Sequence, residues 1–139
     1  MVDRILVDVN VCLDLLLDRH PYVEYSGQIF ELAEQNELSV TVSGLSFDTL
    51  FYIMRPTLGA KASTQILKKF SQHVRVGAVD HSVVQQALEA GWKHLEDALQ
   101  YYCAAESGCS ALVTRNIIDF NPDDDTLSIL TPEQFLNRR

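Results

Sequence analysis

Three aspartates, Asp8, Asp97 and Asp119, stand in settings where acidic side chains do chemistry. Asp8 closes the apolar run over 5–7, Asp97 lies early in a helical pattern, and Asp119 follows the apolar run over 110–114 by a few residues. Carboxylate oxygens are the ligands that hard divalent cations such as Mg²⁺ prefer. One aspartate after a strand is common, whereas three in suitable settings predict a divalent-metal site wherever the three converge.

The elements that must bring these acids together alternate along the chain. Apolar runs of strand length are separated by helical stripes with i, i+3, i+4 spacing, which is typical of βαβ units and a parallel sheet. A capping box at Thr131 and Gln134, with Pro132 between them, predicts a short final helix. The sequence therefore predicts an α/β fold with strands over 4–9, 38–42, 74–79 and 110–114, and a short fifth strand over 127–130.

The three aspartates fall where such a fold forms its sites. In an open parallel sheet the functional crevice lies beyond the carboxyl ends of the strands. Asp8 is expected near the end of the first strand, Asp119 just beyond the fourth, and Asp97 in the first turn of the helix leading into the fourth. We therefore expect the three to meet at one edge of the sheet. Asn10 is expected to be the N-cap of the first helix.

Composition limits the class of protein. With 139 residues and no visible linker, residues 1–139 are expected to form a single domain. The 47% of hydrophobic and 22% of charged residues exclude a disordered chain. No apolar stretch approaches the roughly 18 residues of a membrane span. No signal peptide is recognisable, so a cytoplasmic protein is expected. Three cysteines without metal-ligand spacing are interpreted as small buried or half-buried apolar residues: Cys12, Cys103 and Cys109.

Charge argues against a general nucleic-acid binder. The net charge of −8 disfavours non-specific binding, which depends on neutralising phosphates with Lys and Arg. Asp14 and Asp18 are interpreted as the solvated side of the first helix. One basic concentration in the middle of the chain is the candidate for contact with a polyanion, although a solvated helix face is the better explanation for each of its residues taken singly: Arg55, Lys61, Lys68 and Lys69.

Three phrases carry a resemblance to a known family: ILVDVN (5–10), LEDALQY (95–101) and VTRNIIDF (113–120). Together they closely resemble the PIN-domain family, most strongly the VapC-type toxins of prokaryotic toxin–antitoxin pairs, over nearly the whole chain. The resemblance implies a three-layer α/β/α sandwich with a mainly parallel sheet of four to five strands. It also implies Mg²⁺- or Mn²⁺-dependent cleavage of RNA, a small antitoxin protein as partner, and a homodimer.

The same resemblance assigns roles to residues. Asp8, Asp97 and Asp119 are carried over as catalytic acids and metal ligands. Asp8 and Asp119 are the first choices as ligands, and Asp97 is a ligand or the holder of a coordinated water. Polar companions are expected to orient water or the scissile phosphate by hydrogen bonding, and Arg115 is a weak candidate for RNA contact. The companions are Thr114, Asn116 and, in a supporting role, Asn10.

One position departs from the family pattern. A further acid, commonly Glu, is usual on the helix after the second strand, and ungapped matching places it on Thr49. Asp48 is a neighbouring acid and a candidate metal ligand. However, one helical step rotates a side chain by about 100°, so Asp48 does not simply replace an acid at 49. Glu96, next to Asp97, is a weaker candidate for the same reason.

Three functions are consistent with these residues. The leading hypothesis is a metal-dependent endoribonuclease that acts as the toxin of a toxin–antitoxin pair. The alternative is a PIN-like module that binds RNA or protein, with catalysis weakened or lost because Thr49 is neutral. A phosphotransfer domain with Asp8 as phospho-acceptor ranks last, because a haloacid-dehalogenase-type phosphatase would require an acid where this chain has Asn10.

Overall fold

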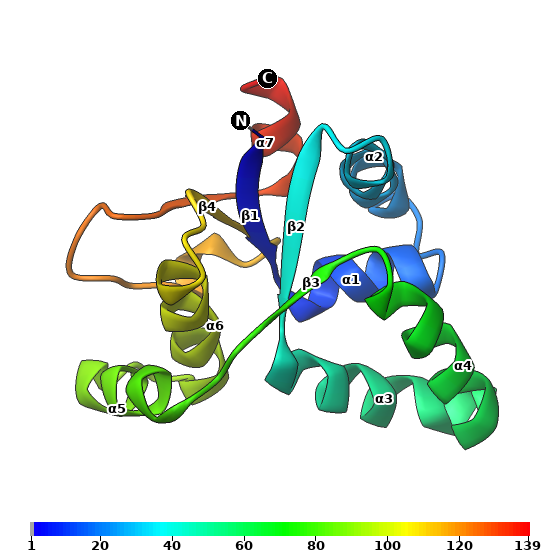
Figure 1. Cartoon of the computed structure of the whole chain (residues 1–139), viewed down its shortest axis with the longest axis horizontal. Helices are drawn as coiled ribbons and strands as arrows, with labels where there is room; N and C mark the ends of the chain where they lie inside the picture. The colour runs from blue at the N-terminus through cyan, green and yellow to red at the C-terminus, as the bar shows by residue number, and fades with distance from the viewer. Residues whose placement is uncertain (1) are drawn as a thin grey trace.

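The computed structural model describes residues 2–139, which place helices on both faces of a sheet (Figure 1). The strands are β1 (Asp3–Val7), β2 (Leu38–Ser43), β3 (Arg75–Gly77), β4 (Ala111–Val113) and β5 (Ser128–Leu130). The helices are α1 (Val9–Leu16), α2 (Val23–Glu34), α3 (Gly44–Leu58), α4 (Ala60–Ser71), α5 (His81–Ala90), α6 (Leu95–Glu106) and α7 (Pro132–Asn137), with a 3₁₀ turn, η1, at Ile117–Asp119.

All strand pairs are parallel, and the strand order is β3-β2-β1-β4-β5. The chain builds outward from β1 through β2 to β3, then returns to lay β4 against the other edge of β1. This reversal makes the carboxyl ends of β1 and β4 a topological switch point, where open parallel sheets form their ligand crevice. Val7 is in register with Val113, so the residues that follow these two strands start side by side.

The sheet separates two apolar cores. Ile5 and Val7 of β1 pack into the core that includes residues of α1, α2, α3, α4 and α7, whereas Leu6 packs into the core with α5 and α6. This alternation follows from the two-residue period of a strand. Figure 1 shows α5 and α6 on one side of the sheet and α1 and α2 on the other. The predicted three-layer α/β/α sandwich with a mainly parallel sheet is confirmed.

The ends of the elements refine the predicted ranges. The first strand was expected to continue to Val9, but it ends at Val7 because the extended Asp8 caps α1 by accepting a hydrogen bond from the Val9 amide. Asn10 lies inside α1, so the expectation that it caps this helix is wrong. The capping box of the final helix is confirmed, with Thr131 as N-cap and Gln134 as its reciprocal partner.

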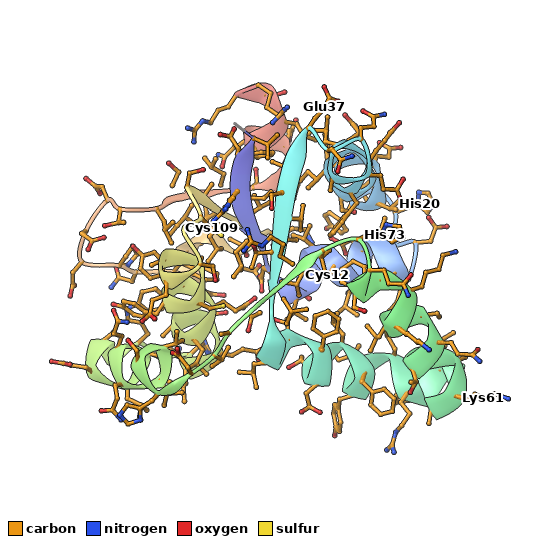
Figure 2. All side chains as sticks on the ribbon, viewed as in Figure 1. Cys12, His20, Glu37, Lys61, His73 and Cys109 are labelled. Atoms are coloured by element: carbon orange, nitrogen blue, oxygen red, sulfur yellow. The ribbon has the colours of Figure 1, made fainter. Side chains whose placement is uncertain are left out.

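Two further sequence expectations concern apolar side chains. The three cysteines are unpaired and buried, as expected; Figure 2 labels two of them, Cys12 and Cys109. Within residues 2–139 no helix combines the length and the apolar character that crossing a membrane requires.

Candidate metal and catalytic site

Asp8 lies at the switch point, and only 5% of its surface is exposed. Its Oδ1 accepts hydrogen bonds from the Val9 amide at 2.7 Å and from Nε2 of Gln100 at 2.8 Å. Its Oδ2 accepts a hydrogen bond from Oγ1 of Thr114 at 2.7 Å. All three donors are neutral. They fix the orientation of the carboxylate, but they do not cancel its charge.

Thr114 connects Asp8 to the turn after β4. Its buried hydroxyl donates to Asp8 and accepts a hydrogen bond from the Asn116 amide at 3.1 Å. The sequence expectation was that Thr114 would orient water or phosphate. The structure instead places it behind Asp8, where it fixes both the carboxylate and the start of the segment that carries Asn116 and Asp119.

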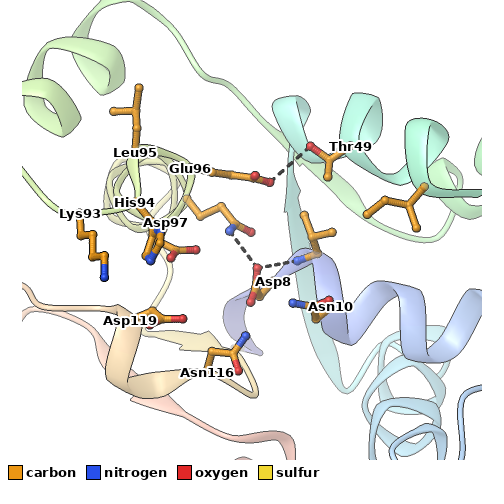
Figure 3. A pocket seen from close by; sticks show the side chains of 13 residues that line it. Asp8, Asn10, Thr49, Lys93, His94, Leu95, Glu96, Asp97, Asn116 and Asp119 are labelled. Atoms are coloured by element: carbon orange, nitrogen blue, oxygen red, sulfur yellow. Dashed lines mark hydrogen bonds between the residues drawn. The ribbon is translucent and has the colours of Figure 1, made fainter.

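A cavity of about 530 Å³ opens beside Asp8. Asp97, from the first turn of α6, and Asp119, from η1, line the same cavity, and Figure 3 shows both pointing toward Asp8. The structure thus brings the three predicted acids to one place from three separate elements. The cavity is also lined by Val9, Asn10, Thr49, Ile53, Lys93, His94, Leu95, Glu96, Gln100 and Asn116.

Asp97 reports the electrostatic state of this cavity. Partial burial, followed by the charges of Asp8 and Asp119, raises the pKa of Asp97 from 3.8 to about 6. His94 opposes this shift and Glu96 adds to it. Like charges close together disfavour ionisation of one another. The raised pKa of Asp97 therefore reflects its partial burial first and, after that, its nearness to the carboxylates of Asp8 and Asp119.

The structure places Asp48 and Glu96, the two acids near Thr49, differently with respect to the cavity. Thr49 lines the cavity, and its Oγ1 donates a hydrogen bond to Oε1 of Glu96 at 3.3 Å across the gap between α3 and α6 (Figure 3). Asp48 is exposed and is absent from the cavity lining. The structure therefore brings Glu96, rather than Asp48, to the side chain at position 49.

Gln100 was not predicted as a site residue. Its side chain is 2% exposed and lines the cavity. Its Nε2 donates a hydrogen bond to Asp8, and its Oε1 is buried without a hydrogen-bond partner. Exchanging the two ends of the amide would set Oε1 against the carboxylate, so this orientation is fixed. The signal in the sequence was its spacing, because a residue three positions after Asp97 shares its helix face.

The predicted basic segment lies away from the acids. Its four cations are exposed on α3 and α4, and they are absent from the cavity lining; Figure 2 shows Lys61 at the outer end of this helix pair. Lys93 does line the cavity and was not predicted. It lies four residues before Asp97, a spacing that would place it near the same face of α6 if the helix were extended backwards. The four exposed cations are Arg55, Lys61, Lys68 and Lys69.

Arg115 and Asp14 form a second charged centre. Nε and Nη2 of Arg115 donate to the two carboxylate oxygens of Asp14 at 2.8 and 3.2 Å, and Arg19 Nε lies 3.4 Å from the same carboxylate. Arg115 also stacks over the Tyr22 ring, 4.0 Å from its centroid. Asp14 is 1% exposed, so its interpretation as a solvated helix residue is wrong. The sequence period of α1 could not reveal a partner 101 residues away.

The cavity has the donor chemistry of a hard divalent cation. Its candidate ligands are carboxylate and amide oxygens, which suit Mg²⁺ or Mn²⁺. In the part of the chain that the structure describes, no group of three or more His, Cys, Asp or Glu side chains is arranged to hold a metal ion directly. Mg²⁺ usually keeps several waters and takes only one or two carboxylates. A shell shared with water therefore fits these residues, and the unpaired Oε1 of Gln100 offers an acceptor for such a water.

Comparison with known proteins agrees with this geometry. The family model for the PIN domain matches residues 4–118. Ribonuclease VapC1 of Aquifex aeolicus (strain VF5) is 26% identical over 141 residues, which cover 98% of this chain and 95% of that protein. DNA-bound VapBC from Salmonella typhimurium has a TM-score of 0.71 at 16% identity, covering 95% of this chain and 99% of that chain. A toxin–antitoxin complex from Klebsiella pneumoniae has a TM-score of 0.67 at 18% identity, covering 91% and 96%.

Proposed function

The chain belongs to the PIN-domain family, as its sequence phrases predicted, and we propose that it is an endoribonuclease that hydrolyses RNA phosphodiester bonds as the toxin of a toxin–antitoxin pair. The observation that carries this proposal is the cavity at the switch point, where Asp8, Asp97 and Asp119 gather. The ribonuclease named among its relatives supports the reaction class. We assign this function to residues 1–139 as one domain.

We propose Mg²⁺ or Mn²⁺ as the cofactor. Such an ion, when bound, lowers the pKa of water and offsets the charge that develops on the phosphate during hydrolysis. Asp8 and Asp119 are its proposed ligands, and Asp97 is a ligand or the holder of a coordinated water. Among the described residues Lys93 is the lysine that lines the cavity, and it is suited to contact a phosphate of the RNA backbone.

Hydrogen bonds between the chain's own residues hold this site in a fixed arrangement. Thr114 and Gln100 hold the Asp8 carboxylate, so one ligand has a fixed position before RNA arrives. By accepting a hydrogen bond from the backbone amide of Asn116, the Thr114 hydroxyl also fixes the turn that carries this residue, and the side-chain amide of Asn116 is suited to orient water or the scissile phosphate. Groups fixed in advance spend less conformational entropy when the transition state forms.

We propose two kinds of protein partner. Structural neighbours include toxin–antitoxin complexes, which supports a small antitoxin protein as partner of this chain. Homodimerisation is supported by exposed apolar side chains on α3, where Tyr52 is 73% and Ile53 is 42% exposed. A monomeric mass in size-exclusion chromatography with light scattering at micromolar concentration would contradict the homodimer.

A second candidate function rests on Thr49. Because this residue places a neutral hydroxyl in the cavity wall, the chain would bind RNA or protein with weak or no cleavage if the remaining acids do not hold a cation. The two functions differ in metal binding. A binding module would show no cation affinity and no divalent-dependent cleavage.

The test is cleavage of total RNA by purified protein with Mn²⁺ or Mg²⁺, with EDTA as the metal-free control. Asp119→Asn serves as the matched variant, because Asp119 is exposed and its loss disturbs little packing. We expect metal-dependent cleavage by the wild type that Asp119→Asn abolishes. RNA binding without cleavage at millimolar Mn²⁺ would instead support the binding module.

A further inference from the structure

We propose that Glu96 supplies the fourth carboxylate of the metal site, reaching from α6 to the part of the cavity wall occupied by Thr49. This inference rests on the proposed function and deepens it. It assigns a ligand or water-holding role toward the divalent cation to a residue that the sequence pattern ranked low. The inference depends on the Thr49–Glu96 contact, on the charge of the cavity and on the unpaired oxygen of Gln100.

The contact places the Glu96 carboxylate on the α3 side of the cavity. Glu96 belongs to the first turn of α6, but its Oε1 accepts a hydrogen bond from the hydroxyl of Thr49 on α3 at 3.3 Å. Both residues line the cavity together with Asp8. Figure 3 shows Glu96 extending from α6 toward Thr49, above the carboxylates of Asp97 and Asp119. The helix that lacks an acid at position 49 therefore faces a carboxylate that comes from the opposite wall.

The charge of Glu96 adds to the negative potential of the cavity. Glu96 lines the same cavity as Asp8, Asp97 and Asp119, and Lys93 also lines this cavity. Within residues 2–139 the ion pairs involve Asp14 and Asp18, and none involves Glu96. A fourth carboxylate beside Asp8, Asp97 and Asp119 further exceeds the charge of Lys93, the lysine that lines the cavity among the described residues, and this costs free energy unless a cation offsets it. A divalent ion would turn this repulsion into binding.

Gln100 provides an independent indication of a ligand. It lies four residues after Glu96 on α6 and lines the same cavity, and its buried Oε1 has no hydrogen-bond partner. A buried acceptor without a donor is uncommon and costs about 1–3 kcal/mol. A water coordinated to a cation between Glu96 and Asp8 would donate to this oxygen. The arrangement of acceptors therefore matches a hydrated cation.

The competing acid lies elsewhere. Asp48 is next to Thr49 in sequence, but one helical step turns it by about 100°, and the structure leaves it exposed outside the cavity lining. The proposal therefore distinguishes Glu96 from Asp48 by position, although both are exposed acids of the same charge near the site.

The experiment is calorimetric titration of Mn²⁺ into the metal-free protein, using the wild type, Asp119→Asn, which is expected to lose binding, and four further variants. We expect Glu96→Gln to weaken Mn²⁺ binding by about 10- to 100-fold. The double variant Thr49→Glu, Glu96→Gln returns a carboxylate to the same space from α3, so it is expected to recover most of the lost affinity. Asp48→Asn and, as a charge control on the surface of α5, Glu89→Gln are expected to bind as the wild type does.

Each outcome separates this inference from the proposed function. Wild-type affinity in Glu96→Gln, with binding lost in Asp119→Asn, would overturn the role of Glu96 and leave the metal site standing. Loss in Asp48→Asn with Glu96→Gln unaffected would move the fourth carboxylate to Asp48. Weakened binding in Glu96→Gln without recovery in the double variant would contradict the claim that a carboxylate at position 49 can occupy the place of the Glu96 carboxylate. No Mn²⁺ binding by the wild type would overturn both the function and the inference.

Discussion

Two buried aspartates at opposite ends of the same short helix differ in the charge of the groups that contact them. Asp8, the N-cap of α1, is 5% exposed and Asp14, in its last turn, is 1% exposed. Asp14 accepts two hydrogen bonds from the Arg115 guanidinium and lies beside Arg19. Asp8 receives three hydrogen bonds from neutral donors. Arginines of the chain supply the countercharge of Asp14, whereas the hydrogen-bond donors of Asp8 are neutral and its proposed countercharge is a bound cation.

The difference distinguishes an acid that is paired with cations of the chain from one that is held by neutral groups alone. A buried charge must be paired or hydrogen-bonded. Asp14 satisfies this rule with Arg19, just after the end of α1, and with Arg115, in the segment after β4. Asp8 satisfies it with hydrogen bonds alone, in a cavity that gathers further acids and raises the pKa of Asp97. The countercharge missing at Asp8 is a more specific sign of a cation site than the number of acids there.

The largest effect is expected from Asp8→Asn. This change preserves shape and the N-cap of α1, since Asn caps helices as well as Asp does, but it removes a fixed carboxylate. We expect Mn²⁺ affinity and RNA cleavage to fall at least as far as the roughly 100-fold upper limit seen for residues that support metal ligands. Calorimetry and a cleavage assay measure this, and Asp14→Asn should retain wild-type Mn²⁺ affinity. Equal Mn²⁺ binding by Asp8→Asn and the wild type would remove the contrast between the two aspartates.

Asp14→Asn is expected to act on stability instead. It deprives two guanidiniums of their shared anion, and the loss of hydrogen bonds to a charged group costs about 1.5–3 kcal/mol. Urea denaturation of the metal-free protein measures this loss as a lower free energy of unfolding. Asp18→Asn is the matched control, because Asp18 is in the same segment and exposed, and surface changes usually stay within about 0.5 kcal/mol. Equal stability of the two variants would show that Asp14 is dispensable.

Thr114→Val tests how the neutral donors support Asp8. It removes the hydroxyl that donates to Asp8 and accepts from the Asn116 amide, with little change in shape. We expect Mn²⁺ affinity to fall about tenfold, the lower end of the range for residues that orient metal ligands. Thr114→Ser keeps the hydroxyl and should stay close to the wild type. If Ser and Val weaken binding equally, the methyl group rather than the hydrogen bond positions Asp8.

The contrast also explains what the sequence could and could not predict. Asp8, Asp97 and Asp119 were found because each follows a local pattern, a strand end or a first helical turn, and the parallel topology brings such positions together. The fold was predictable for the same reason. The Asp14–Arg115 pair and the Thr49–Glu96 contact join residues 101 and 47 positions apart in the sequence. No local period encodes such partners, so Asp14 was misassigned and Glu96 was ranked low.

The smallest effect concerns the pH dependence of the metal-free protein. The folded state holds the Asp97 proton up to a pKa of about 6, whereas the unfolded state releases it near the ordinary value of 3.8. Between these values the folded state binds more protons, so this group lowers the free energy of unfolding as the pH rises from about 4 to 6. Above this window its contribution is constant.

Asp97→Asn isolates that contribution. Other groups titrate in the same range, so the quantity to measure is the difference in unfolding free energy between wild type and variant across pH 4 to 7, by urea denaturation in EDTA. We expect the variant to gain stability relative to the wild type as the pH rises to 6, because it lacks the carboxylate whose ionisation is disfavoured by partial burial and then by the charges of Asp8 and Asp119. A difference independent of pH would mean that the acids do not interact across the cavity. The charges around Asp8 would then give no support to a cation as its partner, and the contrast with Asp14 would rest on the kinds of hydrogen-bond donor alone.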